Sequence, residues 1–220
     1  MAKLLRPKDK VVQELLRLAT EKQHRLTRKR CVVAGSKLVR DLGRRHHFRE
    51  LLAARAGDPA MDGLRSEVRH VASERILRKL AQLKSFDGLV ASLDLPEPRQ
   101  DLGDVRLLLC LEHVKDPGLL GTLLRTAVAF QWQAAFFLPG CADPFEPLCI
   151  RASQGALFDL PHARGTHTDL RRLCDQNGLQ LCVSHGAGAD VGAAGYAPPR
   201  GLALLLREEY AAPSAPPRGA

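Results

Sequence analysis

The stretch DPGLLGTLLRTAVAF, residues 116–130, combines a turn, a helix start and a cation. An Asp-Pro-Gly turn predicts the end of one strand and the beginning of a helix. In open α/β sheets, a glycine-containing loop between a strand and a helix lies at the carboxyl edge of the sheet, where ligands bind. Leu119 follows the turn directly, and Arg125 lies on the turn side of the helix. The stretch therefore predicts a ligand loop with one arginine beside it, although Arg125 as a surface or ion-paired arginine remains an alternative.

The elements that must position this loop come from residues 105–209, where apolar strands alternate with helices. Near-continuous apolar strands predict a parallel sheet that is buried on both faces. The expected strands are 105–114, 134–140, a segment around 149–161, 179–186 and 202–206. Helices are expected at 119–131 and 167–177, the second ending at Gly178. We therefore predict an α/β domain that is doubly wound or a relative of that fold.

The first half of the chain predicts a smaller α/β domain. Residues 8–23 form an amphipathic lead helix, and a short strand then ends at Gly35, with Ser36 as the N-cap of the next helix. Further elements are expected as strands at 48–55, 67–72 and 86–93 and a helix capped by Ser73. Two prolines and four acids mark the boundary within 93–104, which gives a domain over 1–95 and a linker over 96–104.

Positive charge is concentrated in the first half of the chain. Residues 1–100 hold 23 Lys and Arg against 12 Asp and Glu, whereas residues 101–220 hold 10 against 12. Such asymmetry favours contact with a nucleic acid over a merely solubilising surface, because phosphates attract cations whatever the base sequence. The candidate RNA contacts are Arg25, Arg28, Lys29, Arg30, Lys37 and Arg151. For Arg151, an ion pair with Asp143 or Glu146 is an equal alternative.

Other classes of site and environment are not indicated. The apolar runs are far shorter than the roughly 20 residues of a membrane span, and the N-terminus lacks the apolar region of a secretory signal. The six cysteines form no C-x-x-C pair, which predicts reduced and buried thiols. The histidines have no metal-ligand spacing, so we expect no metal. No Ser-His-Asp or phosphate-loop pattern is present.

Two motifs together give the chain a family resemblance. DPGLLGTLLRTAVAF is similar to the first motif, DPGN-x-G-x-x-R-T-A-x-x-F-G, of the SpoU (TrmH-like) RNA 2′-O-ribose methyltransferases of the knotted SPOUT superfamily, and IRASQGALFDLP is similar to their central motif. RCVVAGSKLVRDL and FDGLVASL resemble the start and end of a small N-terminal substrate domain that is similar to RNA-binding ribosomal proteins. The resemblance covers about residues 8–209. It implies an α/β-knot domain, S-adenosylmethionine as cofactor and RNA, most of all rRNA, as substrate.

The resemblance carries over to single residues. Arg125 takes the place of the family's catalytic arginine, whereas Leu119 replaces the motif-one asparagine and can neither donate nor accept a hydrogen bond. In the second motif Glu209 takes the glutamate position, and Arg207 and Tyr210 stand where the family has glycines. Backbone contacts to the cofactor are implied at Ser184, His185, Gly186 and Ala187, for which an ordinary glycine-rich turn is the alternative. The third motif has no counterpart, so we expect an incomplete knot domain over 105–209 and a disordered tail over 210–220.

Two functions follow from this pattern. One is an RNA methyltransferase whose sequence is truncated and whose catalysis is impaired. The other is a non-catalytic RNA-binding protein that serves as a ribosome assembly or structural factor. Leucines within 202–206 are expected at an exposed sheet edge, which a ribosomal or assembly-factor protein would cover. Family members are commonly homodimers through the knotted domain. A homodimer is put in question here, because the helix of the third motif, which contributes to that surface, has no counterpart. The wording of FLPGCADPF, which resembles the plant and algal branch, favours a mitochondrion or chloroplast over the cytosol.

Overall fold

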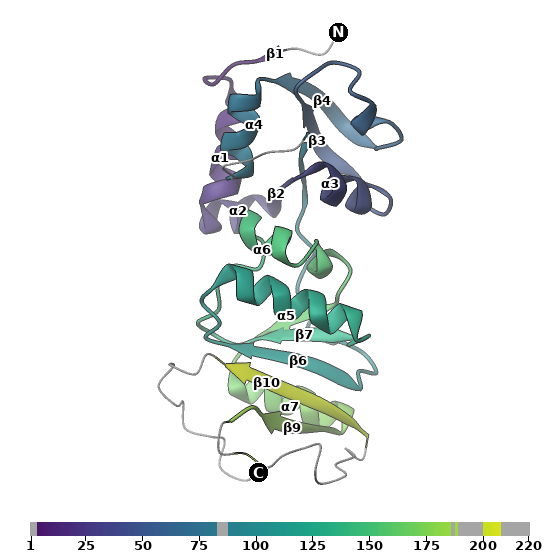
Figure 1. Ribbon diagram of the computed structural model, residues 1–220. Coiled ribbons are helices and arrows are strands. Elements are labelled where there is room, and N and C mark those ends of the chain that lie inside the picture. Colours follow the sequence, from purple (N-terminus) through teal and green to yellow (C-terminus); the bar gives the residue numbers. More distant parts are fainter. Residues whose placement is uncertain (1–3, 83–87, 186–187, 189–199, 208–220) are drawn as a thin grey trace. The chain divides into compact units, whose positions relative to one another are not determined.

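The computed structural model describes residues 4–82, 88–185, 188 and 200–207 of the 220-residue chain (Figure 1). It divides into two compact units. The first unit holds Met1–Pro96 together with Asp143–Gly155, and the second holds Glu97–Ala142 together with Ala156–Ala220. The chain therefore enters the second unit, returns to the first for one short segment and then goes back.

The first unit contains a five-stranded mixed sheet. Its strands follow the order β1-β4-β3-β5-β2, and β5 runs antiparallel to both of its neighbours. The other pairs, β1 with β4 and β3 with β4, are parallel. The elements are β1 (Leu4–Leu5), α1 (Lys10–Thr20), α2 (Lys22–Arg28), β2 (Arg30–Ala34), α3 (Ser36–Gly43), β3 (Phe48–Ala53), η1 (Pro59–Met61), β4 (Ser66–Ala72), α4 (Glu74–Ala81), β5 (Val90–Asp94) and α6 (Pro147–Ala152).

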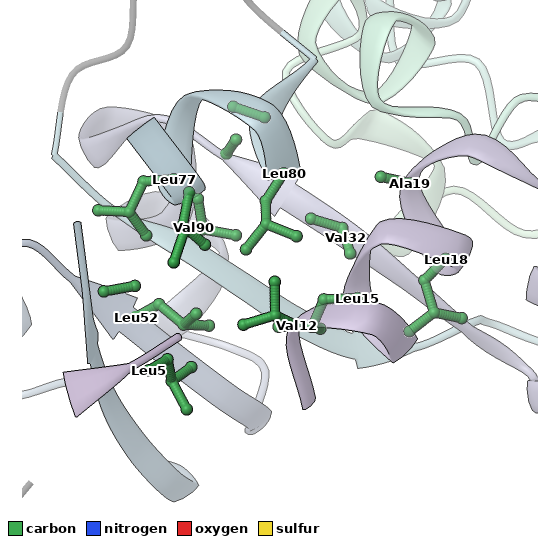
Figure 2. Close-up of a cluster of buried hydrophobic side chains, with 14 residues drawn as sticks. Leu5, Val12, Leu15, Leu18, Ala19, Val32, Leu52, Leu77, Leu80 and Val90 are labelled. Atoms are coloured by element: carbon green, nitrogen blue, oxygen red, sulfur yellow. The ribbon is translucent and has the colours of Figure 1, made fainter. Parts of the chain in front are cut away.

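The core of the first unit lies where α1 and α4 pack on one face of this sheet (Figure 2). Helical spacing puts Leu15 and Leu18 of α1 and Leu77 and Leu80 of α4 on the buried side, each at most 1% exposed. Alternation along β2 brings Val32 to the same cluster. The lead segment thus docks on the sheet, as its amphipathic pattern predicts.

The second unit contains a five-stranded sheet in which every pair is parallel. The strand order is β8-β7-β6-β10-β9. The elements are β6 (Leu107–Glu112), α5 (Pro117–Ala129), β7 (Ala134–Phe137), η2 (Ala156–Phe158), β8 (His162–Arg164), α7 (His167–Asn177), β9 (Leu179–Val183) and β10 (Gly201–Arg207). The parallel sheet that the apolar strands predicted is confirmed.

Helices cover both faces of the second sheet. The crossover from β6 through α5 to β7 moves toward one edge, and the crossover from β8 through α7 to β9 moves to the other. Right-handed crossovers in opposite directions put their helices on opposite faces, as Figure 1 shows. Side chains such as Leu108, Cys110 and Phe136 pack with Leu170 and Leu173 of α7. The arrangement is the doubly wound one expected from the sequence.

Two predictions in the first half need correction. The predicted lead helix is two helices, because the backbone of Glu21 is extended and separates α1 from α2. The Arg25 guanidinium of α2 donates a hydrogen bond to the Leu18 carbonyl of α1. The N-cap of α3 is Gly35, at φ 111°, rather than Ser36. The Ser36 hydroxyl instead occupies the space where a Cβ at Gly88 would stand, and Gly88 itself has a φ of +84°.

Two predictions in the second half are also wrong. The segment around 149–161 forms α6 and η2 rather than a strand, and its first part packs against β2 in the first unit. The expected exposed edge at 202–206 does not exist, because β10 lies between β6 and β9, with Ala203 and Leu205 buried. Strand order depends on pairing between distant segments, which a local apolar run does not reveal.

Some environmental expectations can be compared with the described residues. All six cysteines are free, and burial raises the pKa of Cys31, Cys110 and Cys174. Among the described residues, no helix combines the length and apolar character that a membrane crossing needs. Within the same ranges, no group of three His, Cys, Asp or Glu side chains is arranged to hold a metal ion.

Candidate functional site

The carboxyl edge of the second sheet is the candidate site. Because all strands are parallel, the loops after β6, β7, β8 and β9 leave the sheet at the same edge. β10 lies between β6 and β9, with Arg207 in register with Glu112 and the Ser184 N–H donating to the Leu205 carbonyl at 3.0 Å. The motif-one loop and the predicted cofactor loop therefore flank the end of β10.

The helix α5 begins at this edge with local signals that the sequence contains. Asp116 is the N-cap, and its Oδ1 accepts a hydrogen bond from the Leu119 N–H at 2.5 Å. Pro117 occupies the first turn, where its missing N–H costs nothing. Leu119 is 44% exposed, an apolar side chain at the helix start where a polar one would find water or a ligand. The start of α5 thus presents backbone dipole but no polar side chain at position 119.

The loop after β7 packs against the loop after β6. His113 has a φ of +52°, and its ring lies against Gly140, where a Cβ would come within 2.1 Å of Nδ1. Gly140 also has a φ of +89°, so it meets two requirements that only glycine satisfies. The Ala142 N–H donates to the Val114 carbonyl at 2.8 Å. The loop after β6 is therefore held by the loop after β7.

A buried carboxylate lies at the same edge. Glu112, the last residue of β6, is 2% exposed, and its Oε1 accepts a hydrogen bond from Nε2 of His167 at 2.7 Å. His167 opens α7, whose Thr166 and Asp169 form a capping box. Our reading of the sequence missed this pair. The available signal was a charged residue that ends the apolar run of β6, immediately before the motif.

Of the two predicted catalytic residues, the structure describes Arg125. Arg125 is exposed on α5, and among the described residues no ion pair or hydrogen bond of its side chain is found, so the ion-paired alternative is not supported. Its neighbours Leu120, Leu124 and Ala127 are buried and face the core. Glu209 lies outside the described residues.

The predicted cofactor loop is described only at its start. Ser184 and His185 are exposed directly after β9, and the Gly188 N–H donates to the His185 carbonyl at 2.9 Å. Gly186 and Ala187 lie outside the described residues. Arg207 is half-buried at the end of β10.

Two of the predicted RNA contacts prove to be internal. Arg25 is 3% exposed, and its guanidinium pairs with Asp143 at 2.8 Å and donates to the Leu18 carbonyl at 2.8 Å. Arg30 is half-buried between Glu50 and Ser92. Burial contradicts the assignment of Arg25 to RNA. The assignment of Arg30 stays a prediction, which its bonds within the first unit make less favourable.

The other predicted contacts are exposed. Arg28 pairs with Glu14 at 2.9 Å, and Lys37 pairs with Asp41 at 2.9 Å one turn away. Lys29 closes α2 in a left-handed conformation. Arg151 projects from α6, and no ion pair of it is found among the described residues; Asp143, one expected partner, is taken by Arg25. These four side chains are accessible to a polyanion.

A known family profile matches the part of the chain that contains the second sheet. The profile of the SpoU rRNA Methylase family matches residues 106–211. An uncharacterized tRNA/rRNA methyltransferase of Synechocystis is 38% identical over 93 residues, 42% of this chain and 34% of that protein. The 23S rRNA (guanosine(2553)-2′-O)-methyltransferase RlmP of Bacillus subtilis is 32% identical over 95 residues, 43% of this chain and 38% of that protein. Human mitochondrial rRNA methyltransferase 3 is 42% identical over 55 residues, 25% of this chain and 13% of that protein. The matches thus span well under half of each relative.

Solved structures agree with the sequence comparison. An rRNA methyltransferase from Sinorhizobium meliloti is 25% identical, with a TM-score of 0.79 over 96% of this chain and 84% of that one. An AdoMet-bound rRNA methyltransferase from the same bacterium has a TM-score of 0.80 at 22% identity, over the same shares of the two chains, which supports the fold. Residues 106–211 of this chain, which include the motif-one loop and the parallel sheet that holds it, belong to the SpoU rRNA methylase family.

Proposed function

We propose that this protein binds ribosomal RNA as a SpoU-type RNA 2′-O-ribose methyltransferase whose transfer step is impaired. The observation that carries the proposal is the family's first motif at the start of α5, with Arg125 retained and Leu119 in place of asparagine. The relatives named as rRNA methyltransferases support the substrate class, and the 2′-O activity named for the Bacillus protein supports the reaction.

The impairment follows from what methyl transfer needs. The ribose hydroxyl must be held in line with the methyl donor, and most of the rate comes from that positioning. The hydroxyl proton must also leave. Leu119 offers no hydrogen bond from its side chain, and its backbone N–H is taken by Asp116. Arg125 alone then has to orient the RNA, which we expect to be insufficient.

S-adenosylmethionine is the cofactor that we infer, with backbone contacts at residues 184–187. The described residues fit it incompletely. Arg207 closes β10 beside Glu112, at a position where the resemblance places a glycine for close approach. We therefore expect an affinity for S-adenosylmethionine that is weaker than that of a relative with glycine at that position.

The non-catalytic function is the second candidate, and Leu119 favours it. In that case the protein would use exposed cations of the first unit, Arg28, Lys29, Lys37 and Arg151, to hold rRNA during ribosome assembly. A ribosomal or assembly-factor partner and a homodimer remain proposals. The mitochondrial relative agrees with an organellar location, which stays a prediction.

Tritium transfer from S-adenosylmethionine to rRNA separates the two candidates. We expect little transfer by the natural chain, and at least about tenfold more by Leu119→Asn, because one restored transition-state hydrogen bond is worth about that factor. Arg125→Ala in the Leu119→Asn background should abolish the gain. Transfer by the natural chain as fast as by Leu119→Asn would contradict impairment. No transfer by either, with no calorimetric binding of S-adenosylmethionine, would establish the non-catalytic function.

A further inference from the structure

The imidazole of His167 is held at the carboxyl edge of the second sheet. Its Nε2 lies 2.7 Å from Oε1 of Glu112, which is 2% exposed at the end of β6. The pair joins this strand to the first turn of α7. Glu112 also directly precedes the loop over 113–116 that leads into α5. The pair therefore adjoins the loop that carries the family motif, and the impaired transfer proposed above makes no use of it.

The backbone that carries His167 is fixed as well. The Gly165 N–H donates to the Phe137 carbonyl at 3.2 Å, and a Cβ at Gly165 would come within 2.8 Å of the Asp169 Cβ. Thr166 and Asp169 then form the capping box that starts α7. Because the loop has no room for a further side chain and the helix start is doubly bonded, His167 has few alternative positions. A precise contact with a ligand requires supporting residues that are held in this way.

The hydrogen bond to Glu112 decides which ring nitrogen is left for a ligand. An ionised carboxylate only accepts hydrogen bonds, so Nε2 of His167 carries the proton and donates it. In the neutral imidazole the other nitrogen, Nδ1, is then an acceptor. Within the part of the chain that the structure describes, Nδ1 has no partner, and the side chain of His167 is 37% exposed. The ring thus offers one hydrogen-bond acceptor to a group outside the protein.

We propose that His167 accepts a hydrogen bond from a ribose 2′-hydroxyl of the bound RNA strand, and that Glu112 positions its ring. The 2′-hydroxyl is the one donor of the RNA backbone, because phosphate oxygens only accept, and DNA lacks it. Base edges donate too, but they are distinguished by paired donors and acceptors, whereas His167 supplies a single acceptor. The residue therefore sets a preference for RNA over DNA rather than for a base sequence. This inference rests on the proposed function, that the chain binds RNA.

The test compares binding of one rRNA fragment, as a fluorescent RNA strand and as the DNA strand of the same sequence, to the full chain. In His167→Gln the amide N–H can still donate to Glu112, but the ring acceptor is gone. Affinity for RNA should therefore fall about three- to tenfold, while affinity for DNA stays the same. Glu112→Gln should show part of this loss, because an amide donates as well as accepts and no longer fixes the ring. Thr168→Ala, an exposed neighbour on α7, is the matched control and should change neither affinity.

The outcomes separate this contact from the proposed function. A natural chain that binds no RNA refutes the function and the contact together. A natural chain that binds RNA, with both affinities unchanged in His167→Gln, refutes the contact alone and leaves the pair a structural link. Equal losses for RNA and DNA, with the slope of log K against log salt lowered by about 0.7, would make His167 a phosphate contact and overturn the proposal. If His167→Gln does not fold, the natural chain is tested with a 2′-fluoro strand, whose sugars cannot donate; an affinity equal to that for RNA overturns the proposal.

Discussion

The two units differ in the ion pairs that they hold. In the first unit, seven of the described Lys and Arg side chains have a carboxylate partner. The ion pairs there are Arg17–Glu21, Arg25–Asp143, Arg28–Glu14, Arg30–Glu50, Lys37–Asp41, Arg49–Asp94 and Arg78–Glu74. In the second unit, which lies within the half of lower net charge, Arg172 lies 3.5 Å from Asp169 and His167 bonds to the buried Glu112. Several cations of the basic first half are thus engaged within the fold, so net charge counted along the sequence does not by itself locate a surface for a polyanion.

The interiors differ as well. The first unit buries a complete ion pair, Arg25 with Asp143, at 3% and 5% exposure. The second unit keeps its strands apolar and places its buried carboxylate, Glu112, at the carboxyl edge of the sheet. The first arrangement fastens the returning segment 143–155, and the second leaves a polar group where the family's motif begins.

The largest expected effect is on the buried pair. Arg25→Ala leaves Asp143 buried without its counter-ion, which should lower the free energy of unfolding by about 3–5 kcal/mol. Arg28→Ala removes an exposed partner of Glu14 and should cost less than about 1 kcal/mol. Urea unfolding of both variants measures the difference.

A double variant tests whether the unpaired charge of Asp143 causes the loss of stability. R25M/D143L replaces the pair by apolar side chains and should recover most of the loss, because neither charge is then stranded. An Arg25→Ala chain as stable as Arg28→Ala would show that the pair does not fasten the segment.

The next effect concerns pH and the second unit. His162 has a folded pKa of about 4, below the ordinary value of 6.5, so the unfolded chain binds the proton first as pH falls. Its contribution to stability is complete above pH 6.5 and is lost between 6.5 and about 4, by about 3 kcal/mol at most. His162→Gln should unfold with a flatter dependence over that window. Parallel pH curves for the two chains would be inconsistent with a neutral buried imidazole.

Features whose signal lies within a short stretch of sequence were predicted, and features that depend on pairing between distant segments were not. The limits of α7 were predicted at both ends, because its Gly178 C-cap is a local feature. The parallel sheet followed from apolar runs in neighbouring segments. The place of β10 did not, because it depends on pairing with β6 and β9.

The site shows the same division. The motif-one loop was found because its residues are contiguous. Arg25 was predicted to contact RNA because it lies in a basic run. Its partner Asp143 lies 118 positions away, so no local feature of the sequence indicates the ion pair. Glu112 and His167, which are 55 positions apart, form no run in the sequence, and only the fold brings them together.

A smaller effect is expected at the motif edge. Gly140→Ala places a Cβ against the His113 ring at a positive φ, and should cost about 2 kcal/mol, of which about 1 comes from the backbone. Gly103→Ala, also at positive φ but with nothing within 4 Å, supplies the backbone cost alone. Thermal unfolding compares them. Equal losses would mean that the His113 ring moves aside freely and that the two loops are not locked.

The smallest effect tests the first unit's surface. Within the part of the chain that the structure describes, the exposed Lys37 pairs only with Asp41, one turn away, so Lys37→Gln should change the free energy of unfolding by less than about 0.5 kcal/mol. If Lys37 contacts one RNA phosphate, the same change should lower the salt slope of RNA binding by about 0.7. Lys22→Gln, an exposed lysine at the start of α2, is the matched control. A salt slope that Lys37→Gln leaves unchanged would remove Lys37 from the RNA surface, and a drop for Lys37→Gln but not for Lys22→Gln would show that Lys37 contacts the strand despite its ion pair with Asp41.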